Sequence, residues 1–335
     1  MSSHQANRIH KVALVGGSGQ IGSVILQSLL NTTKHEVTVL TRPDSNSSFS
    51  PSPNLTVVQV DYASATAITK ALRSHDFLII TLSARAPPNL HAQIVQAAAE
   101  AGIQWIMPNY WAFALGPRGG ALAADPLFSS FGKSIDDVRN VSAPEGGVKP
   151  NFVALCNGFW YEFSLSMGEP WFGFDIKNRK VTLYDEGTVK INTSTWDLCG
   201  RAVASLLSLP VAGNEDGKLA LDRFRNDGVT ISSFLVSQRD MLDSLNRVLG
   251  TSDADWSITK QAARERHLQG LQQLQGGDRL GFAKAMYARL FFPGEGGDYE
   301  TGYTLDNETL GLSKEDLDEA TKRAVEMVAN GAGIH

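Results

Sequence analysis

Three glycines near the N-terminus, Gly16, Gly19 and Gly22, have the spacing of a phosphate-binding loop. They stand between an apolar run, Val12 to Val15, and a segment, Ile21 to Leu30, whose apolar residues have helical spacing. In such a strand–turn–helix unit the first glycine permits the tight turn, the second lets backbone amides approach a pyrophosphate, and the third lets the helix pack on the sheet. The helix N-terminus also favours negative charge. The loop therefore predicts a bound dinucleotide, and a purely structural turn is the alternative.

The residues that end the next strand indicate which dinucleotide is bound. Domains that prefer NAD place Asp or Glu there, where it bonds the ribose 2′-hydroxyl. This chain has Thr41 and Arg42 instead. A guanidinium can bind a 2′-phosphate through two hydrogen bonds, and no carboxylate precedes it to repel that group. We therefore expect NADP(H), with an exposed strand-ending arginine as the alternative. Asp61 is expected to bind the adenine amino group or to cap the following helix.

Alternating strands and helices position these residues. Apolar runs bounded by turn residues predict strands at 12–15, 36–40, 55–60, 77–81, 105–108 and 152–156. Helical spacing predicts helices at 21–30, 63–74, 91–101, 131–141 and 194–207. Strands and helices that alternate in units of this length imply parallel strands with right-handed crossovers. The expected fold is therefore α/β, a doubly wound parallel Rossmann sheet that binds ligands at the carboxyl ends of its strands.

The regular alternation fails beyond about residue 160. We expect a polar tail over 1–10, a Rossmann domain over 11–160 that is completed by about 190–225, and a smaller, mainly helical C-terminal substrate-binding domain from 161–189 and 226–335. The last helix is expected to begin with a capping box formed by Ser313 and Asp316.

Composition excludes several classes of partner. The 335 residues are 42% apolar, enough for a large core, and the formal charge is −5 with 30 scattered Lys and Arg residues. Neither nucleic acid nor a membrane surface is an expected partner. The two cysteines, Cys156 and Cys199, lack metal or disulfide spacing, so we expect no metal and a reduced, cytoplasmic location. The first residues, MSSHQANRIHK, lack the apolar core expected of a signal peptide, and no run approaches the roughly 20 apolar residues of a membrane span.

Two common catalytic patterns are missing. No tyrosine has a lysine four positions later, so the Tyr-x-x-x-Lys pair of many short-chain reductases is absent. No Gly-x-Ser-x-Gly motif follows a strand, which argues against a serine hydrolase.

Several segments together are similar to one enzyme family. The runs VALVGGSGQIG, VTVLTRP, HAQIVQAAAEAG, WIMPNYWAF and ALCNGFW, with the acidic stop at Asp61, resemble the NmrA-like, isoflavone-reductase-like branch of atypical short-chain dehydrogenases/reductases, in particular its fungal CipA-like members. The resemblance covers about residues 10–165 well and the rest loosely. It implies an NADPH-dependent reductase of secondary metabolism. The expected cofactor-binding residues are Gly16, Ser18, Gly19, Gln20, Ile21, Gly22, Thr41, Arg42, Asp61, Ser83, Asn109, Lys133, Asn157 and Phe159.

The resemblance also suggests a proton donor. Plant reductases of this family use a lysine on the helix after the fifth strand, and Lys133 is the best match, although its spacing to Arg139 departs from the family arrangement. A solvated surface lysine is the alternative. Where the plant enzymes have Pro-Ser-Glu-Phe-Gly, this chain has Pro-Asn-Tyr-Trp-Ala-Phe at 108–113. Tyr110 is therefore a second candidate donor, with a packing tyrosine as its alternative.

An aromatic cluster follows the sixth strand. Side chains from it are expected to line an apolar substrate pocket, with Tyr110, Trp111, Phe113, Trp160 and Phe163 as the substrate residues. The loop over 291–303 is expected either to close over this pocket or to be mobile. His91, near the end of the fourth strand, acts on a ligand or is a surface or capping histidine, and the second reading is favoured.

The leading hypothesis is an NADPH-dependent oxidoreductase, acting as a monomer or homodimer. Hydride passes to a carbonyl, enone or benzylic carbon of an apolar aromatic or polyketide-like small molecule, while Lys133 or Tyr110 protonates the developing anion. One alternative is an NADP(H)-binding redox sensor or regulatory protein. A second is a non-redox isomerase or cyclase on the same fold.

Overall fold

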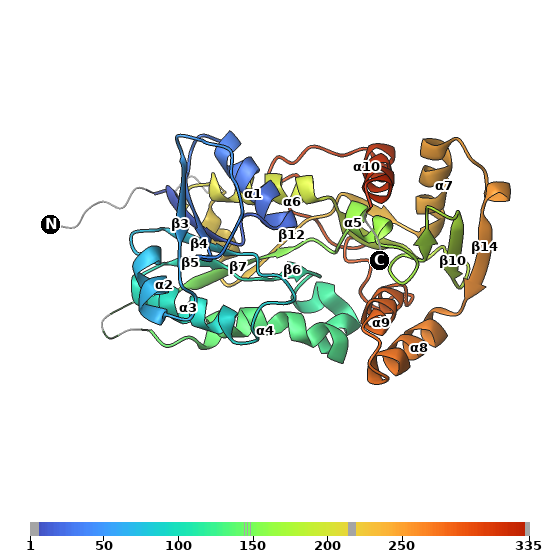
Figure 1. Cartoon of the computed structure of the whole chain (residues 1–335), viewed down its shortest axis with the longest axis horizontal. Helices are drawn as coiled ribbons and strands as arrows, with labels where there is room; N and C mark the ends of the chain where they lie inside the picture. Colours follow the sequence, from blue (N-terminus) through green and yellow to red (C-terminus); the bar gives the residue numbers. More distant parts are fainter. Residues whose placement is uncertain (1–6, 144, 146, 148, 214–218, 332–335) are drawn as a thin grey trace.

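The computed structural model describes residues 7–143, 145, 147, 149–213 and 219–331. A parallel sheet fills the N-terminal half, with the strand order β3-β2-β1-β4-β5-β7-β12 and β6 paired to β7 (Figure 1). Its strands are β1 (Lys11–Val15), β2 (Glu36–Thr41), β3 (Leu55–Gln59), β4 (Phe77–Ile80), β5 (Trp105–Met107), β6 (Trp111–Ala112), β7 (Asn151–Cys156) and β12 (Asp227–Thr230). The order reverses between β1 and β4, as in doubly wound folds.

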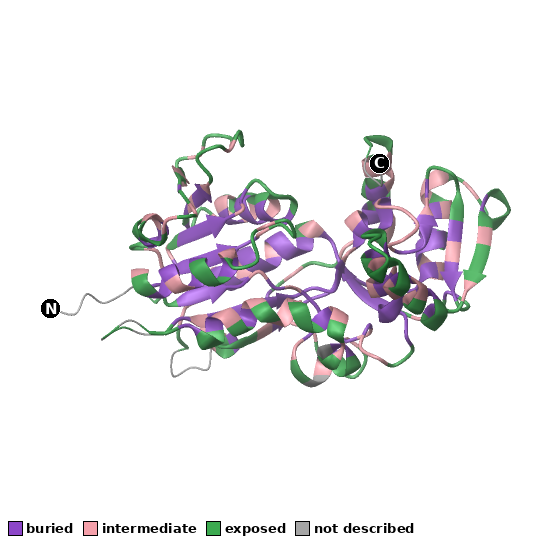
Figure 2. Cartoon of the chain, turned by 60° about the horizontal axis from the view of Figure 1, so that its bottom comes forward, coloured by how far each residue is buried: buried purple, intermediate pink, exposed green. Residues whose placement is uncertain are grey.

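Helices cover both faces of this sheet. They are α1 (Gln20–Asn31), α2 (Ala65–Leu72), α3 (Leu90–Ala101), α4 (Pro126–Asn140) and α6 (Trp196–Leu207). Alternate residues of β4 feed two separate cores: Leu78 and Ile80 pack with α2 to α4, whereas Phe77 and Ile79 pack with α1 and α6. The strands are accordingly buried between layers of helices in Figure 2. The expected doubly wound Rossmann architecture is confirmed.

The C-terminal half joins helices to small sheets. Its helices are α5 (Tyr161–Ser166), α7 (Gln238–Leu249), α8 (Ala263–Gln275), α9 (Leu280–Leu290) and α10 (Leu317–Ala329). One sheet contains β9 (Phe174–Asp175), β10 (Lys180–Tyr184) and β14 (Ser257–Gln261), and another contains β8 (Phe159–Trp160), β11 (Ile191–Ser194) and β13 (Phe234–Val236). The helices of this half agree with the expectation from the sequence. The short strands between them were not expected.

Several expected boundaries need correction. The Rossmann sheet extends past residue 225, because β12 pairs in parallel with β7. The last helix begins at Leu317 with Asp316 as its N-cap, so Ser313 forms no capping box and instead accepts a hydrogen bond from Arg201. The polar tail is anchored at its described end, since Ile9 is buried. Residues 1–6 of that tail lie outside the described residues.

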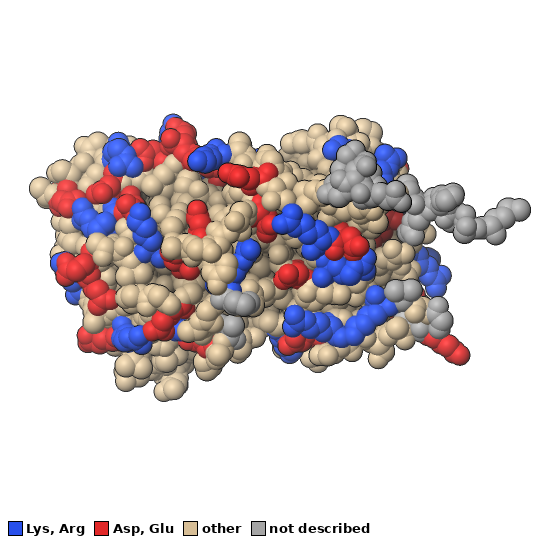
Figure 3. Space-filling model, turned by 180° about the vertical axis from the view of Figure 1, so that it is seen from behind, with Lys and Arg blue, Asp and Glu red and all other residues tan. Residues whose placement is uncertain are grey.

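The surface carries both signs of charge. Lys and Arg side chains are interspersed with Asp and Glu over the face seen in Figure 3. In the described part of the chain, no helix is long and apolar enough to cross a membrane.

The hairpin of α8 and α9 depends on a close backbone approach. A β-carbon on Gly270 would lie 2.5 Å from the Ala285 backbone nitrogen, and one on Gly281 would overlap the carbonyl oxygen of Gly270. The lack of a side chain at Gly270 and at Gly281 therefore sets the distance between α8 and α9. This contact fixes the position of α9.

We expect Gly270→Ala to lower the free energy of unfolding by about 1–3 kcal/mol, because the added methyl group forces the two helices apart. Urea denaturation monitored by circular dichroism measures the change. Gly132→Ala is the matched control: Gly132 also lies inside a helix, but a β-carbon there meets nothing within 4 Å. That substitution should stabilise the protein by roughly 0.5–1 kcal/mol. Equal losses from both substitutions would contradict the packing argument.

Candidate functional site

The glycine loop lies at the point where the order of the sheet strands reverses. Thr81, directly after β4, donates both its backbone N–H and its hydroxyl to the carbonyl oxygen of Val15, at 3.0 and 2.8 Å. Gly16 has φ +81°, and a β-carbon on it would overlap the Thr81 carbonyl oxygen. A β-carbon on Gly22 would overlap the carbonyl oxygen of Gly16. Packing inside the chain therefore requires the first and third glycines.

The second glycine has no such internal reason. Gly19 is exposed, and among the described residues a β-carbon there would meet the Gly16 carbonyl oxygen alone, at 3.3 Å. It is the N-cap of α1 and supplies no capping side chain. Ser18 and Gln20 on either side of it are exposed too. The bare, outward-facing backbone at a helix N-terminus fits an approaching pyrophosphate, which distinguishes this loop from a purely structural turn.

A cavity of about 640 Å³ begins at this loop. It runs past Thr81 to Ala84 and Asn109 to an aromatic wall. The expected cofactor residues that line it are Gly19, Gln20, Ile21, Ser83, Asn109 and Phe159. The expected substrate residues that line it are Trp111, Phe113, Trp160 and Phe163. Residues that were predicted from distant segments of the sequence thus line one cavity.

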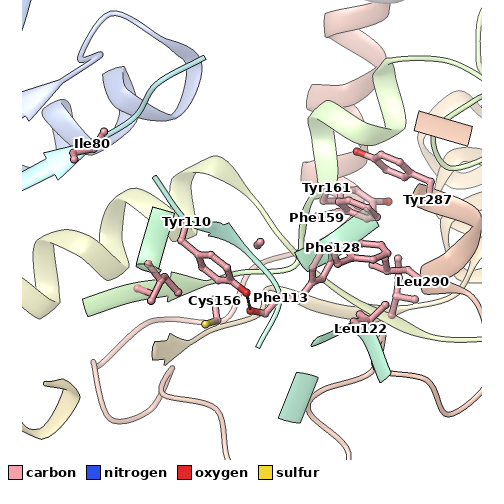
Figure 4. Close-up of a cluster of buried hydrophobic side chains, with 14 of the residues drawn as sticks. Ile80, Tyr110, Phe113, Leu122, Phe128, Cys156, Phe159, Tyr161, Tyr287 and Leu290 are labelled. Atoms are coloured by element: carbon pink, nitrogen blue, oxygen red, sulfur yellow. Dashed lines mark hydrogen bonds between the residues drawn. The ribbon is translucent and has the colours of Figure 1, made fainter. Parts of the chain in front are cut away.

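Tyr110 lies behind the cavity wall rather than on it. The side chain is buried, and its hydroxyl donates to the Phe113 carbonyl oxygen at 2.8 Å, drawn as a dashed line in Figure 4. Burial raises the pKa of this phenol. Tyr110 does not line the cavity. Its expected role as a proton donor or substrate contact is therefore replaced by the packing role, because the hydroxyl is turned into the core.

Lys133 is exposed on α4 and does not line the cavity either. Phe131 on the same helix does line it, and two residues along a helix rotate the side chain by about 200°. The β-carbon of Lys133 therefore points away from the face that Phe131 presents. The geometry supports the solvated alternative, because the ammonium group starts from the far side of the helix.

The strand-end residues expected to hold the adenosine half are accessible. The Arg42 side chain is 71% exposed, with its Nε 3.6 Å from a carboxylate oxygen of Asp44. Thr41 beside it is half-buried. Asp61 is exposed and accepts a hydrogen bond from the Ala63 backbone, whereas the N-cap of α2 is Ser64. Asp61 is thus not the helix cap, and the adenine role stays a prediction.

Asn157 is fully buried and does not line the cavity. Its amide nitrogen donates to the Gly158 carbonyl oxygen, and its Oδ1 has no partner among the described residues. Gly158 does line the cavity, with φ +65°. Of the expected Asn-Gly-Phe segment, the glycine and the phenylalanine therefore face the hollow.

Helix α9 supplies a wall that the sequence analysis missed. It contributes Leu280, Phe282, Ala283, Met286 and Tyr287, with Arg279 just before it. The Tyr287 ring stacks on Phe159 at a centroid distance of 3.8 Å (Figure 4). The Tyr287 hydroxyl also shares a hydrogen bond with the Ser164 hydroxyl. Apolar helical spacing can be recognised over 280–290, but no local signal shows that this helix lies over the strand ends. The expected lid over 291–303 does not line the cavity: Phe291, Phe292 and Tyr299 are buried in the core.

His91 supports the cavity residue Asn109 from the buried side of the wall. Its Nε2 accepts from the Asn109 backbone N–H at 3.2 Å, so the proton resides on Nδ1, which donates to Asp137 at 2.7 Å. Asn109 in turn bonds both the N–H and the carbonyl oxygen of Leu82 through its side chain. His91 is buried, so the favoured surface or capping reading is wrong. The histidine positions a cavity residue and does not touch the cavity itself.

Comparison with known proteins is consistent with this geometry. Residues 16–116 match the family model described as NAD(P)H-binding. Oxidoreductase aprR of Aspergillus flavus is 27% identical over 92% of this chain and 96% of its own length. Oxidoreductase poxI of Penicillium oxalicum is 24% identical over 95% and 94%. Residues 16–116 thus form an NAD(P)H-binding domain, and the chain is similar over nearly its whole length to fungal oxidoreductases.

Solved structures have the fold of this oxidoreductase. The crystal structure of isoflavone reductase superimposes with a TM-score of 0.70 at 16% identity, covering 94% of this chain and 99% of that one. The NADPH-dependent quinone oxidoreductase QOR2 of Escherichia coli gives 0.62 at 17% identity, with coverage of 94% and 99%. The expected fold, the reductase class and the nicotinamide cofactor are thereby confirmed.

We expect Arg42→Ala to weaken NADPH binding to this oxidoreductase by about 10- to 100-fold, the range of a charge-assisted hydrogen bond. NADH lacks the 2′-phosphate, so its affinity should stay within about twofold. Fluorescence titration with each cofactor measures both constants. Asp44→Asn keeps the guanidinium and removes the nearby carboxylate, so it should tighten NADPH binding. An equal loss for NADH and NADPH in Arg42→Ala would assign the arginine a different role.

We expect a dependence of stability on pH that runs partly through His91. Burial lowers its pKa below 6.5, against the opposing hydrogen bond to Asp137. The unfolded chain therefore takes up a proton more readily, so stability is full above about pH 6.5 and is lost as the pH falls through and below it. Burial lowers the pKa of His35 and His75 as well, and both add to the same trend.

His91→Gln removes one titrating group, so its melting temperature should fall less between about pH 7 and pH 5 than that of the wild type. Thermal melts across this range measure the slope. A slope that is unchanged in His91→Gln would contradict a neutral buried imidazole.

Proposed function

We propose that this oxidoreductase uses NADPH to reduce a carbonyl, enone or benzylic carbon of an apolar aromatic or polyketide-like metabolite. The observation that carries the proposal is one continuous cavity, which begins at the dinucleotide loop and ends at aromatic side chains of the C-terminal half. A ligand at the loop and a ligand at the aromatic wall would share this hollow, so a nicotinamide and a substrate can meet in it.

The residues at the loop fit the cofactor. The backbone of Gly19 to Ile21 and the N-terminus of α1 would hold the pyrophosphate, and Arg42 would hold the 2′-phosphate. Ser83, Asn109 and Phe159 would lie along the nicotinamide half. The bound nicotinamide supplies a hydride. The chain would orient it toward the aromatic wall of the cavity.

The aromatic wall fits a flat, apolar substrate. Phe113, Phe159, Trp160, Phe163 and Trp171 line the cavity, and rings of this kind bind aromatic ligands by stacked and edge-to-face contacts. Related folds are named for large aromatic ligands: one was solved with NADP⁺ and (+)-pinoresinol, and another is a triphenylmethane reductase. These neighbours support the same substrate class for this chain.

One feature favours a second candidate function. Among the described residues that line the cavity there is no carboxyl group, histidine or lysine. Reduction then needs a proton from water admitted at the exposed rim near Ser83, or from a group outside the lining such as Lys133. An NADP(H)-binding redox sensor needs no proton donor at all.

The proposal is tested by loss of NADPH absorbance with aromatic ketones, enones and quinones, against aliphatic ketones of similar size. We expect turnover with the aromatic set. Phe163→Ala should raise KM by about 2- to 10-fold, since an aromatic contact contributes roughly 0.5–1.5 kcal/mol. Tyr303→Ala changes an exposed ring outside the cavity and should leave KM unchanged.

The proton donor is tested in the same assay. Because Lys133 is exposed on the far face of α4, we expect Lys133→Ala to keep turnover within about twofold of the wild type. Loss of turnover with unchanged NADPH affinity would instead identify the lysine as the donor. Tight NADPH binding without turnover on any aromatic probe would favour the sensor.

A further inference from the structure

The mouth of the cavity carries an isolated positive charge. Arg279 stands just before α9 and is the one charged residue among the described residues that line the cavity. It is exposed, and its side chain makes no hydrogen bond or ion pair with any residue that the structure describes. A cation in this position is available to a ligand.

Other arginines of the same hairpin are engaged. Arg266 is buried and bonds Glu169 at 2.7 Å. Arg289 is buried and bonds Asp125 at 2.7 Å and Glu295 at 3.1 Å. Arg264 pairs with Glu295. The chain therefore supplies carboxylates to the arginines that have a structural role in the hairpin, and it supplies none to Arg279.

The carboxylate next to Arg279 in the sequence is occupied. Asp278 accepts a hydrogen bond from the backbone N–H of Leu280 at 2.9 Å, which holds it at the start of α9. Asp278 does not line the cavity. The guanidinium is thus the charge that a ligand meets at this edge.

Apolar side chains flank the cation. Leu280 and Phe282 line the same mouth and are 36% and 37% exposed, which is unusual for large apolar side chains in this protein. An apolar surface beside an unpaired guanidinium suits a ligand that is aromatic in its body and anionic at one end.

We infer that the substrate carries an anionic group, such as a carboxylate, and that Arg279 binds this group at the cavity mouth while the aromatic wall holds the rest. The inference rests on the proposed function and specifies its substrate class. The competing source of negative charge is the cofactor pyrophosphate. Arg42 and the N-terminus of α1 are already placed for the cofactor phosphates, and α9 belongs to the opposite half of the molecule (Figure 1).

The test uses two fluorescent probes that differ in one group: anilinonaphthalene sulfonate, which is anionic, and phenylnaphthylamine, which lacks the sulfonate. Both are titrated into the full chain. We expect Arg279→Gln to weaken sulfonate binding by about 5- to 20-fold and to leave the neutral probe within about twofold, because only the sulfonate pairs with the guanidinium. Arg279→Lys should recover part of the loss, since it restores the charge without the planar fork.

Three controls make the result decisive. Lys322→Gln removes an exposed charge on α10, outside the cavity, and should change neither affinity. Phe163→Ala should weaken both probes, which shows that they occupy the cavity. NADPH titration of Arg279→Gln should match the wild type. Loss of NADPH affinity would overturn the inference by assigning Arg279 to the cofactor, and equal affinities of Arg279→Gln and the wild type for the sulfonate would overturn it directly.

The outcome is separable from that of the proposed function, because probe binding needs no turnover. A sulfonate preference that depends on Arg279, in a protein that reduces none of the aromatic carbonyl compounds, would remove the reductase proposal alone. Turnover that is the same for an aromatic keto acid and its methyl ester would remove the anionic substrate alone.

Discussion

The site depends on how closely the glycine loop crosses the end of β4. Thr81 donates twice to the carbonyl oxygen of Val15, and this ties β4 to β1 where the strand order reverses. The loop then passes so near Thr81 that neither Gly16 nor Gly22 can carry a side chain. The start of α1 is thereby fixed against the sheet, with exposed backbone on its outer side. Residues after β4, which include Ser83, are brought beside that backbone by the same contact.

A second close approach joins the two halves. Gly158 has φ +65°, and a β-carbon on it would overlap the carbonyl oxygen of Asn192 in β11. This bend carries the chain from β7 of the Rossmann sheet into β8, where Phe159 reaches Tyr287 of α9. The stacked rings form part of the cavity wall. One glycine thus allows side chains of both halves to face a common hollow.

The sequence was most informative where function and packing need the same residue. Glycines in the loop and the apolar runs of the parallel strands have local signatures, so the sheet and the cofactor end could be predicted. The surroundings of the Tyr110 and Lys133 side chains could not be predicted. A shift of one residue along the chain decides whether a side chain faces the ligand, the core or the solvent. Helix α9 was missed as a wall because its placement results from Gly270 and Gly281, whose contact joins residues with no shared motif. The buried His91 is similar: its partner Asp137 lies 46 residues away.

The distribution of charge in the cavity constrains the chemistry that it can support. A charged group deep in an apolar hollow loses hydration, and it is stable only with a partner. The described lining avoids that cost by leaving its one charge at the mouth, where the Arg279 side chain stays in water. Stabilisation of the negative charge that develops on the substrate oxygen during hydride addition must then come from dipoles and from water at the rim, while the guanidinium selects and orients the far end of the ligand. Such a division suits hydride transfer, in which the cofactor supplies the reactive atom and the protein supplies shape, orientation and an apolar surface.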